Sequence, residues 1–167
     1  YKMGALPITA DAREALRALS AAAEASGIQS NGNYLEEVTG VKRKWSERLQ
    51  KETYCAVPGE AMGQGELIHI INSEAQSGDT IVAAAGTPPG DLLQLWDTSG
   101  GRFCHLEFGF SCMGYELPAG LGVRLAQPGG EVFVFVGDGT YLLQPTELVT
   151  AVQEELKITV IVSENHG

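Results

Sequence analysis

The stretch VFVFVGDGTYLLQPTELVTAV, residues 132–152, decides the fold. It opens with five apolar, strand-forming residues that run directly into Gly137-Asp138-Gly139. Pro145 then begins a helical pattern, because proline is well tolerated in the first turn of a helix. A strand that is apolar throughout and is followed by a helix is typical of a parallel sheet covered by helices on both faces.

The second half of the chain repeats this alternation of apolar strands and helices. We expect strands at residues 80–86, 131–136 and 157–162, helices at 66–75, 117–127 and 145–156, and a loop with a short helix at 87–96. Residues 103–116 are aromatic and interrupted by glycines, which indicates a short strand and a loop. The sequence therefore predicts an α/β fold with a parallel sheet and helices on both of its faces.

The first part of the chain has a different pattern. Residues 10–26 are alanine-rich and predict a helix that Asp11 can cap. Residues 36–52 carry many charges, with apolar residues spaced by four, and predict an amphipathic helix on a surface. The segments 27–35 and 53–65 are rich in turn residues and are interpreted as linkers.

Composition limits the possible partners. The 167 residues carry a formal net charge of −10, so nucleic acid and anionic membranes are unfavourable partners. We find no apolar run of about 18 residues and no signal peptide, and therefore expect no membrane span. The three cysteines lack CxxC spacing, which favours buried thiols in a reducing cytoplasm. Since the sequence opens without Met and stops just after a strand, we expect a fragment of a longer polypeptide.

Two strands of the predicted sheet end in polar residues. Strand 132–136 is followed by Asp138, and strand 158–162 is followed by Asn165. A right-handed helical crossover makes the strands parallel, so both ends lie at the edge where open α/β sheets bind ligands. The side chains of Asp138 and Asn165 and the carbonyl of Gly167 are oxygen ligands that suit Mg²⁺. The backbone N–H groups of Gly139 and Thr140 can face phosphate oxygens, which predicts a metal-dependent diphosphate site.

A GDG triplet alone is a weak signal, but here an Asn follows the Asp after 165 − 138 = 27 positions, across a helix and a strand. This arrangement resembles the thiamine diphosphate motif, with Glu164 replacing the first of two Asn residues. Residues 60–167 resemble the trihydroxycyclohexane-dione hydrolases of myo-inositol catabolism, a group in the acetohydroxyacid synthase branch of thiamine diphosphate enzymes. The stretch that carries the resemblance is HLEFGFSCMGYELPAGLGVRLAQPGGEVFVFVGDGTYLLQPTELVTAVQEELKITVIVSENHG.

The resemblance implies a cofactor site that binds thiamine diphosphate and Mg²⁺. It assigns Asp138, Asn165 and the Gly167 carbonyl to the metal, and Gly139 and Thr140 to the diphosphate. Further cofactor contacts are implied in the SCMG and AAGTPPGD stretches: Met113 under the bent cofactor, the Ser111 carbonyl on its aminopyrimidine, and Thr87 on its diphosphate.

The resemblance also implies a reaction and an assembly. The reaction is hydrolysis of a C–C bond that opens the ring of a cyclic dione, and its catalytic Glu comes from another domain of a partner subunit. It further implies a homo-oligomer, a dimer or a tetramer, with the site between subunits. Residues 1–27 would be the tail of a central α/β domain, 28–62 a linker, and 63–167 the first part of the diphosphate-binding domain.

Several interpretations stay open at this point. His105 is either a half-buried structural histidine or a catalytic acid or base that faces the substrate, and Glu107 and Glu116 are expected to be structural or capping. Another enzyme of the same branch, such as an acetolactate synthase-like carboligase, is the nearest alternative function. A non-catalytic nucleotide-binding module is a second one, although no GxGxxG follows the strands. A third is a fragment with exposed sheet edges that folds poorly and binds nothing alone.

Overall fold

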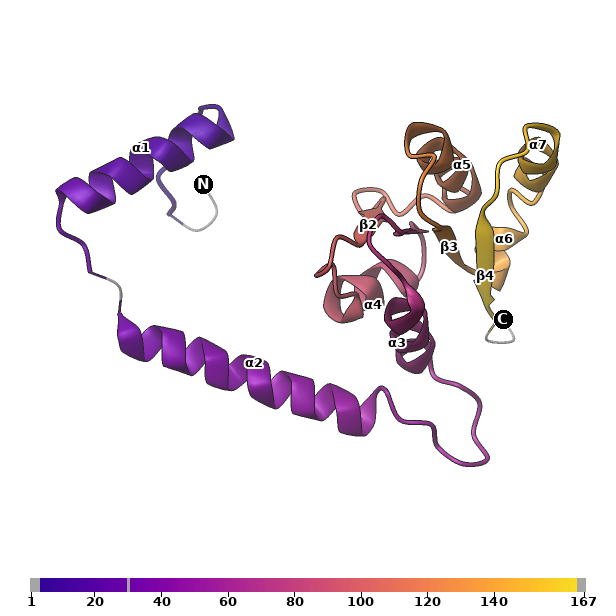
Figure 1. The fold of residues 1–167 in the computed structure, drawn as a ribbon, viewed down its shortest axis with the longest axis horizontal. Helices are drawn as coiled ribbons and strands as arrows, with labels where there is room; N and C mark the ends of the chain where they lie inside the picture. Colours follow the sequence, from indigo (N-terminus) through magenta and orange to yellow (C-terminus); the bar gives the residue numbers. More distant parts are fainter. Residues whose placement is uncertain (1–3, 30, 165–167) are drawn as a thin grey trace. The chain divides into compact units, whose positions relative to one another are not determined.

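The computed structural model describes residues 4–29 and 31–164 (Figure 1). The chain divides into two compact units, Tyr1–Ser46 and Glu47–Gly167, and the sheet lies entirely in the second. Among the described residues, no helix combines the length and the apolar character that crossing a membrane requires.

The first unit is helical. Helix α1 (Ala12–Ala25) begins as predicted, because a carboxylate oxygen of Asp11 accepts the N–H groups of Arg13 and Glu14 at 3.0 and 3.2 Å. Helix α2 (Gly32–Glu52) begins four residues earlier than predicted. The cause is Asn31, whose side-chain oxygen accepts the N–H of Asn33 at 3.1 Å.

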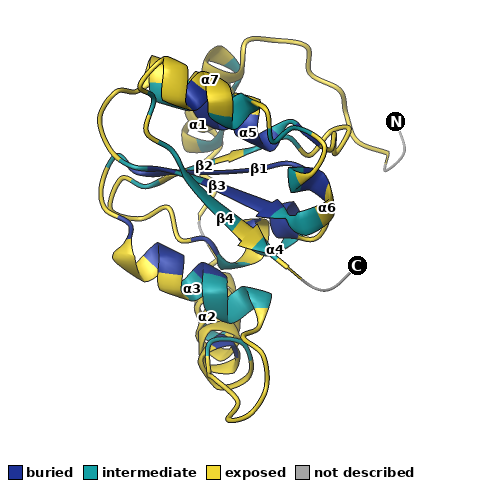
Figure 2. Cartoon of the chain, turned by 90° about the vertical axis from the view of Figure 1, so that its right-hand side faces the viewer, coloured by how far each residue is buried: buried dark blue, intermediate teal, exposed yellow. Residues whose placement is uncertain are grey.

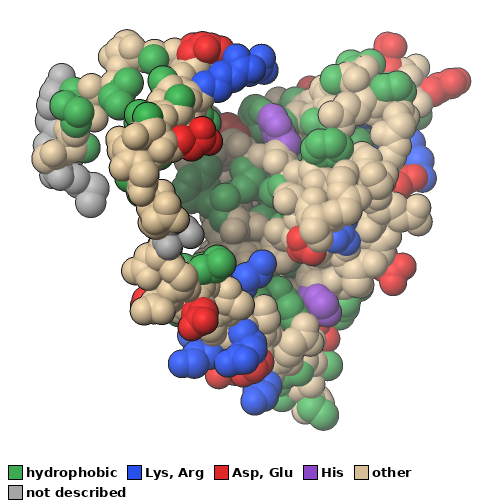
Figure 3. Space-filling view, turned by 60° about the vertical axis from the view of Figure 1, so that its left-hand side comes forward, with side chains coloured by type: hydrophobic (Ala, Val, Ile, Leu, Met, Phe, Trp, Pro, Cys, Tyr) green, Lys and Arg blue, Asp and Glu red, His purple; other side chains and the backbone are tan. Residues whose placement is uncertain are grey.

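Helix α2 has the charged surface that the sequence predicts. Figure 3 shows several Lys and Arg side chains gathered on one surface. Helix α2 carries Lys42, Arg43, Lys44, Arg48 and Lys51, all of them exposed. Leu49 is the only buried residue of this helix, and it belongs to the second unit. The charge run is therefore a solvated face, and the apolar positions nearer the start of the helix are exposed in the part of the chain that the structure describes.

The second unit contains one parallel sheet in the order β2-β1-β3-β4. Its strands are β1 (Thr80–Ala83), β2 (Phe103–Leu106), β3 (Val132–Gly137) and β4 (Thr159–Ser163). The prediction of a parallel sheet is confirmed, and β3 and β4 are neighbours, with Gly137 beside Ser163. Strand β1 is buried along its whole length, as expected when helices cover both faces.

Helices cover both faces of this sheet (Figure 2). They are α3 (Gln64–Glu74) and α4 (Pro88–Leu95) on one face, and α5 (Glu116–Ala126) and α7 (Glu147–Gln153) on the other. The core on the α3 and α4 side contains Ile68, Ile71, Ala75, Ile81, Ala83, Leu92, Trp96 and Phe135. On the other face α5 lies close to β3, and Gly120 allows this close approach because it has no Cβ. A Cβ at this position would overlap the Cγ2 methyl of Val134.

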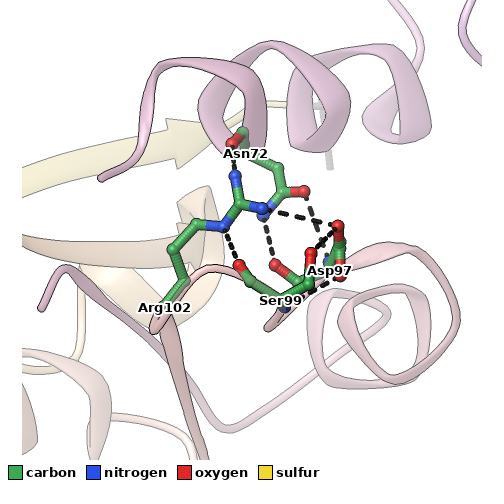
Figure 4. A network of polar contacts seen from close by, with 4 residues as sticks. All are labelled: Asn72, Asp97, Ser99 and Arg102. Atoms are coloured by element: carbon green, nitrogen blue, oxygen red, sulfur yellow. Dashed lines mark hydrogen bonds and ion pairs between the residues drawn. The ribbon is translucent and has the colours of Figure 1, made fainter. Parts of the chain in front are cut away.

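A polar network connects three segments at the amino edge of the sheet (Figure 4). The guanidinium of Arg102, just before β2, donates to the carbonyl of Asn72 on α3 at 2.9 Å and to that of Ser99 at 3.0 Å. The side-chain amide of Asn72 donates to the carbonyl of Asp97 at 3.1 Å. These bonds connect α3, the loop after α4 and β2 at the end of the sheet opposite the predicted site.

Candidate functional site

A cavity of about 600 Å³ opens at the carboxyl edge of the sheet. It lies where β1, β3 and β4 end, which is the place where open α/β sheets bind ligands. The lining residues are Met62, Gln64, Ala85, Gly86, Thr87, Pro88, Asp91, Met113, Gly137, Asp138, Gly139, Thr140, Ser163 and Glu164.

The GDG triplet forms the end of β3 and the start of a short helix. Gly137 is the last residue of β3, and Asp138 opens the one-turn helix α6 (Asp138–Tyr141). This helix lies beside the ends of β3 and β4 (Figure 2). A Cβ built on Gly137 or Gly139 would meet no atom within 4 Å, so the backbone is open to an approaching ligand here.

Gln64 connects three elements of the cavity wall. It is the first residue of α3, and its side-chain N–H donates to the Thr87 hydroxyl at 3.1 Å and also to the Asp91 carboxylate. Its side-chain oxygen accepts from the Ser163 hydroxyl, at the end of β4, at 3.3 Å. Thr87 in turn is the N-cap of α4, so the positive end of that helix dipole meets the cavity.

The loop between β2 and α5 contributes Met113, which is 54% exposed, to the cavity. Ser111 in the same loop has a left-handed φ of 53°, which is costly for a residue with a side chain. Its hydroxyl donates to the carbonyl of Ala84 at 3.4 Å. Two N–H groups of this loop, those of Phe110 and Cys112, donate to the carboxylate of Glu107 at 2.9 and 2.8 Å.

Those two backbone donors change the acidity of Glu107. The N–H of Cys112, followed by that of Phe110, lowers the pKa of Glu107 below its ordinary value of 4.5. Hydrogen bonds to a carboxylate favour its charged form. The ionised Glu107 therefore holds the loop in the conformation that includes the strained Ser111.

The cavity is acidic. Asp91, Asp138 and Glu164 line it, while no Lys, Arg or His within residues 4–29 and 31–164 does so. A diphosphate would be repelled by three carboxylates unless a divalent cation lay between them and the phosphate oxygens. The described part of the chain contains no cluster of three or more His, Cys, Asp or Glu side chains that could hold a metal.

His105 lies outside this cavity. It is on the edge strand β2, and its Nε2 is 2.8 Å from the hydroxyl of Tyr115, with the two rings stacked at 6.0 Å. His105 is among the residues that line a smaller pocket of about 210 Å³, together with residues of α5. The catalytic role expected for His105 stays a prediction.

Five of the expected site residues meet in one cavity: Thr87, Met113, Asp138, Gly139 and Thr140. Ser111 lies in the adjoining loop and does not line the cavity. The two remaining metal ligands expected, Asn165 and Gly167, lie outside the described residues.

Sequence reasoning missed the contributions of Gln64, Asp91 and Ser163. A topological signal points to the first two: α3 precedes β1 and α4 follows it, so both helices begin at the carboxyl edge of the sheet. Polar residues in their first turns are thereby brought to the site. Ser163 follows from the register, because it pairs with Gly137 of the GDG triplet.

This geometry defines a class: parallel α/β proteins with a ligand-sized cavity at the carboxyl edge of the sheet. Comparison with known proteins defines it further. Residues 84–167 match the family described as thiamine pyrophosphate enzyme, C-terminal TPP binding domain. The chain therefore belongs to the thiamine pyrophosphate enzymes, through that C-terminal domain.

The chain is also similar to proteins named 3D-(3,5/4)-trihydroxycyclohexane-1,2-dione hydrolase. It is 34% identical over 188 residues to the one of Clostridium perfringens strain 13, which covers 99% of this chain. It is 35% identical over 189 residues to that of Bacillus cereus strain AH820, and 36% identical over 191 residues to that of Halalkalibacterium halodurans. The chain spans about 29% of the length of these relatives.

Proposed function

We propose that this chain is part of a thiamine diphosphate- and Mg²⁺-dependent hydrolase that opens the ring of trihydroxycyclohexane-1,2-dione in inositol breakdown. The observation that carries the proposal is the cavity that gathers Thr87, Met113, Asp138, Gly139 and Thr140. The membership in the thiamine pyrophosphate enzymes supports the cofactor. The names of the relatives support the substrate, and the similarity extends over nearly the whole chain.

The residues present fit a diphosphate bound through a metal ion. The open backbone at Gly137 and Gly139 leaves room for phosphate oxygens, and the acidic lining needs a cation. Asp138 would bind Mg²⁺ together with the Asn165 side chain and the Gly167 carbonyl. Such a set combines one carboxylate with neutral oxygens and leaves positions for phosphate and water.

The remaining contacts would hold and orient the cofactor. Gly139, Thr140 and Thr87 would bind the diphosphate, Met113 would support the bent cofactor from below, and the Ser111 carbonyl would accept from the aminopyrimidine. When bound, thiamine diphosphate supplies a carbon nucleophile that stabilises carbanions next to a carbonyl group. The protein contributes binding, orientation and exclusion of water.

Other parts of the proposal concern the complete enzyme. The catalytic Glu would come from another domain of a partner subunit, in a homo-oligomer with the cofactor site between subunits. We propose that residues 1–27 are the tail of a preceding domain and that His105 is an acid or base for the substrate. A cytoplasmic location is supported by the three cysteines, which are all free thiols. The prediction that these thiols are buried is wrong, because Cys55 and Cys112 are exposed and Cys104 is half-buried.

Calorimetric titration of thiamine diphosphate, with and without Mg²⁺, tests the site directly. We expect Mg²⁺-dependent binding by the wild type. We expect at least about a tenfold loss in Asp138→Ala, because one metal ligand is removed. Glu154→Ala is the matched control, since it removes the same charge from an exposed position on the far end of α7.

Two outcomes contradict the proposal. Equal affinity of the wild type and Asp138→Ala would show that Asp138 is not a ligand, and absence of binding by folded wild type would contradict the cofactor site. Turnover assays on the longest parent chain then separate the hydrolase from the carboligase. Ring opening of the cyclic dione supports the first, and carboligation of pyruvate the second.

A further inference from the structure

Glu116 is an unusual residue for its position. It is the first residue of α5 and is completely buried, with an exposed fraction of 0%. Burying a carboxyl group is costly unless each oxygen has a hydrogen-bond partner. One oxygen has a partner, and no donor in the described part of the chain reaches the other, Oε2.

The single bond of Glu116 leads to the cavity wall. Its Oε1 accepts the backbone N–H of Ala85 at 2.9 Å, across 31 positions of sequence. Ala85 lines the cavity and directly precedes Gly86, which has a left-handed φ of 80°, and Thr87. The carboxyl group thus fixes the backbone at the start of the turn that presents Thr87.

A helix-capping role does not account for this side chain. An acidic residue in a first turn interacts favourably with the helix dipole. Helix α5, however, has no side-chain capping bond, and the bond of Glu116 goes to the loop after β1 instead. Burying Oε2 without a hydrogen-bond partner destabilises the folded protein. We therefore attribute to the carboxyl group the role of fixing the loop after β1.

We propose that Glu116 is a positioning residue that sets the Ala85–Thr87 turn for the diphosphate of the cofactor. This inference rests on the proposed function, because it concerns the same cavity. Ala85 donates its N–H to Glu116 and Ala84 accepts the Ser111 hydroxyl through its carbonyl. Two hydrogen bonds therefore fix the residues at the start of this turn: one from Ser111 in the loop between β2 and α5, and one to Glu116 on α5.

Three variants test the proposal. Glu116→Gln keeps an oxygen acceptor for the Ala85 N–H, whereas Glu116→Met keeps the approximate volume and removes the acceptor. Glu147→Met is the matched control, because Glu147 stands in the first turn of α7 and does not line the cavity. Affinity for thiamine diphosphate with Mg²⁺ is measured by calorimetry, and folding is checked by thermal unfolding.

Amide hydrogen exchange without cofactor gives a second readout. If Glu116 were important only for overall stability, its replacement would speed exchange throughout the unit and not only in the Ala85–Thr87 turn. We expect faster exchange at Ala85, Gly86 and Thr87 in Glu116→Met, and near wild-type exchange in Glu116→Gln. We also expect about tenfold weaker cofactor binding in Glu116→Met, and affinities within about twofold of the wild type in the other two variants.

The outcomes separate this inference from the proposed function. If the wild type and Glu116→Met bind the cofactor equally, the positioning role is wrong and the cofactor site stands. If folded wild type binds no cofactor, the proposed function fails and this role toward the diphosphate fails with it. Unchanged exchange at residues 85–87 in Glu116→Met overturns the inference whatever the cofactor does. If Glu116→Met does not fold, Glu116→Ala takes its place, because it also removes the acceptor of the Ala85 N–H. Faster exchange at residues 85–87 and weaker cofactor binding in Glu116→Ala then support the role, and wild-type values of both overturn it.

Discussion

Glu107 makes the conformation of the loop between β2 and α5 dependent on pH. Its pKa in the folded protein lies below the ordinary 4.5, so it contributes stability above that value and loses it as the pH falls through the folded pKa. Glu107→Gln removes the charge that accepts the N–H groups of Cys112 and Phe110. We expect the variant to be less stable than the wild type at about pH 7, and the difference to shrink as the pH falls below 4.5 and through the lower pKa of the folded protein.

Urea unfolding at several pH values measures this difference in the free energy of unfolding. Glu60→Gln is the control, because Glu60 is exposed and its change removes the same charge. A gap between wild type and Glu107→Gln that stays constant from neutral to acid pH would show that the carboxylate does not stabilise the loop through its charge.

At the scale of single elements, the contact between α5 and β3 depends on one glycine. A Cβ at Gly120 would overlap a methyl group of the fully buried Val134, whereas a Cβ at Gly122 meets no atom within 4 Å. We expect Gly120→Ala to destabilise the protein by about 1–3 kcal/mol through overpacking. Gly122→Ala should stabilise it by up to about 1 kcal/mol, because alanine has the higher helix propensity.

Thermal or urea unfolding of both variants distinguishes packing from propensity. The two substitutions are chemically identical and lie in the same helix, two positions apart. Equal effects on the free energy of unfolding would show that α5 is not pressed against β3 at Gly120.

The end of α7 offers a second test at this scale. Glu155 has a left-handed φ of 53°, and the N–H of Leu156 donates to the carbonyl of Ala151 at 2.8 Å. This is the Schellman arrangement, in which glycine is preferred at the left-handed position. Glu155→Gly should therefore stabilise the protein by about 0.5–1 kcal/mol.

The neighbouring residue provides the control for that substitution. Glu154 has a φ of −94°, so Glu154→Gly gains no relief of strain and adds flexibility. We expect it to lower the free energy of unfolding. The same sign for both substitutions, measured by urea unfolding, would exclude strain at Glu155.

The type and order of the elements in the second unit could be predicted because they depend on local patterns. Apolar runs at β1, β3 and β4 and the rule of right-handed crossovers were enough to predict that β3 and β4 run parallel. Their pairing as neighbours is shown by the structure. Helix α7 ends three residues before the predicted position, since a left-handed Glu155 carries no sequence signal. Helix α6 was also missed, because a single turn is shorter than any periodicity can reveal.

The residues of the candidate site also fall into two groups, those that a local sequence pattern predicts and those that only the packed structure reveals. Asp138, Gly139 and Thr140 follow a recognisable strand, so their position in the cavity could be predicted. The bonds of Gln64 and of Glu116 arise only when segments distant in sequence are packed together. No local pattern distinguishes Glu116 from an ordinary acidic residue in a first helical turn.

At the scale of the whole molecule, the sheet leaves two strand edges open. Within the described residues, β2 pairs only with β1 and β4 pairs only with β3. Unpaired edges of this kind can pair with another chain. Val162 on β4 is 41% exposed and adds apolar surface to one edge. We expect this chain to self-associate as its concentration rises, and Val162→Lys to weaken the association, because a charged side chain on an edge strand opposes pairing.

Sedimentation velocity over a range of concentrations measures this association. Val152→Lys is the matched control, because Val152 lies on α7 with 79% of its surface exposed and does not belong to the sheet. If the chains pair at the edge of β4, Val162→Lys weakens the association and Val152→Lys leaves it near the wild-type level. Equal reduction by both variants would assign the association to general apolar contacts, and a monomer at every concentration would show that the edge of β4 is protected.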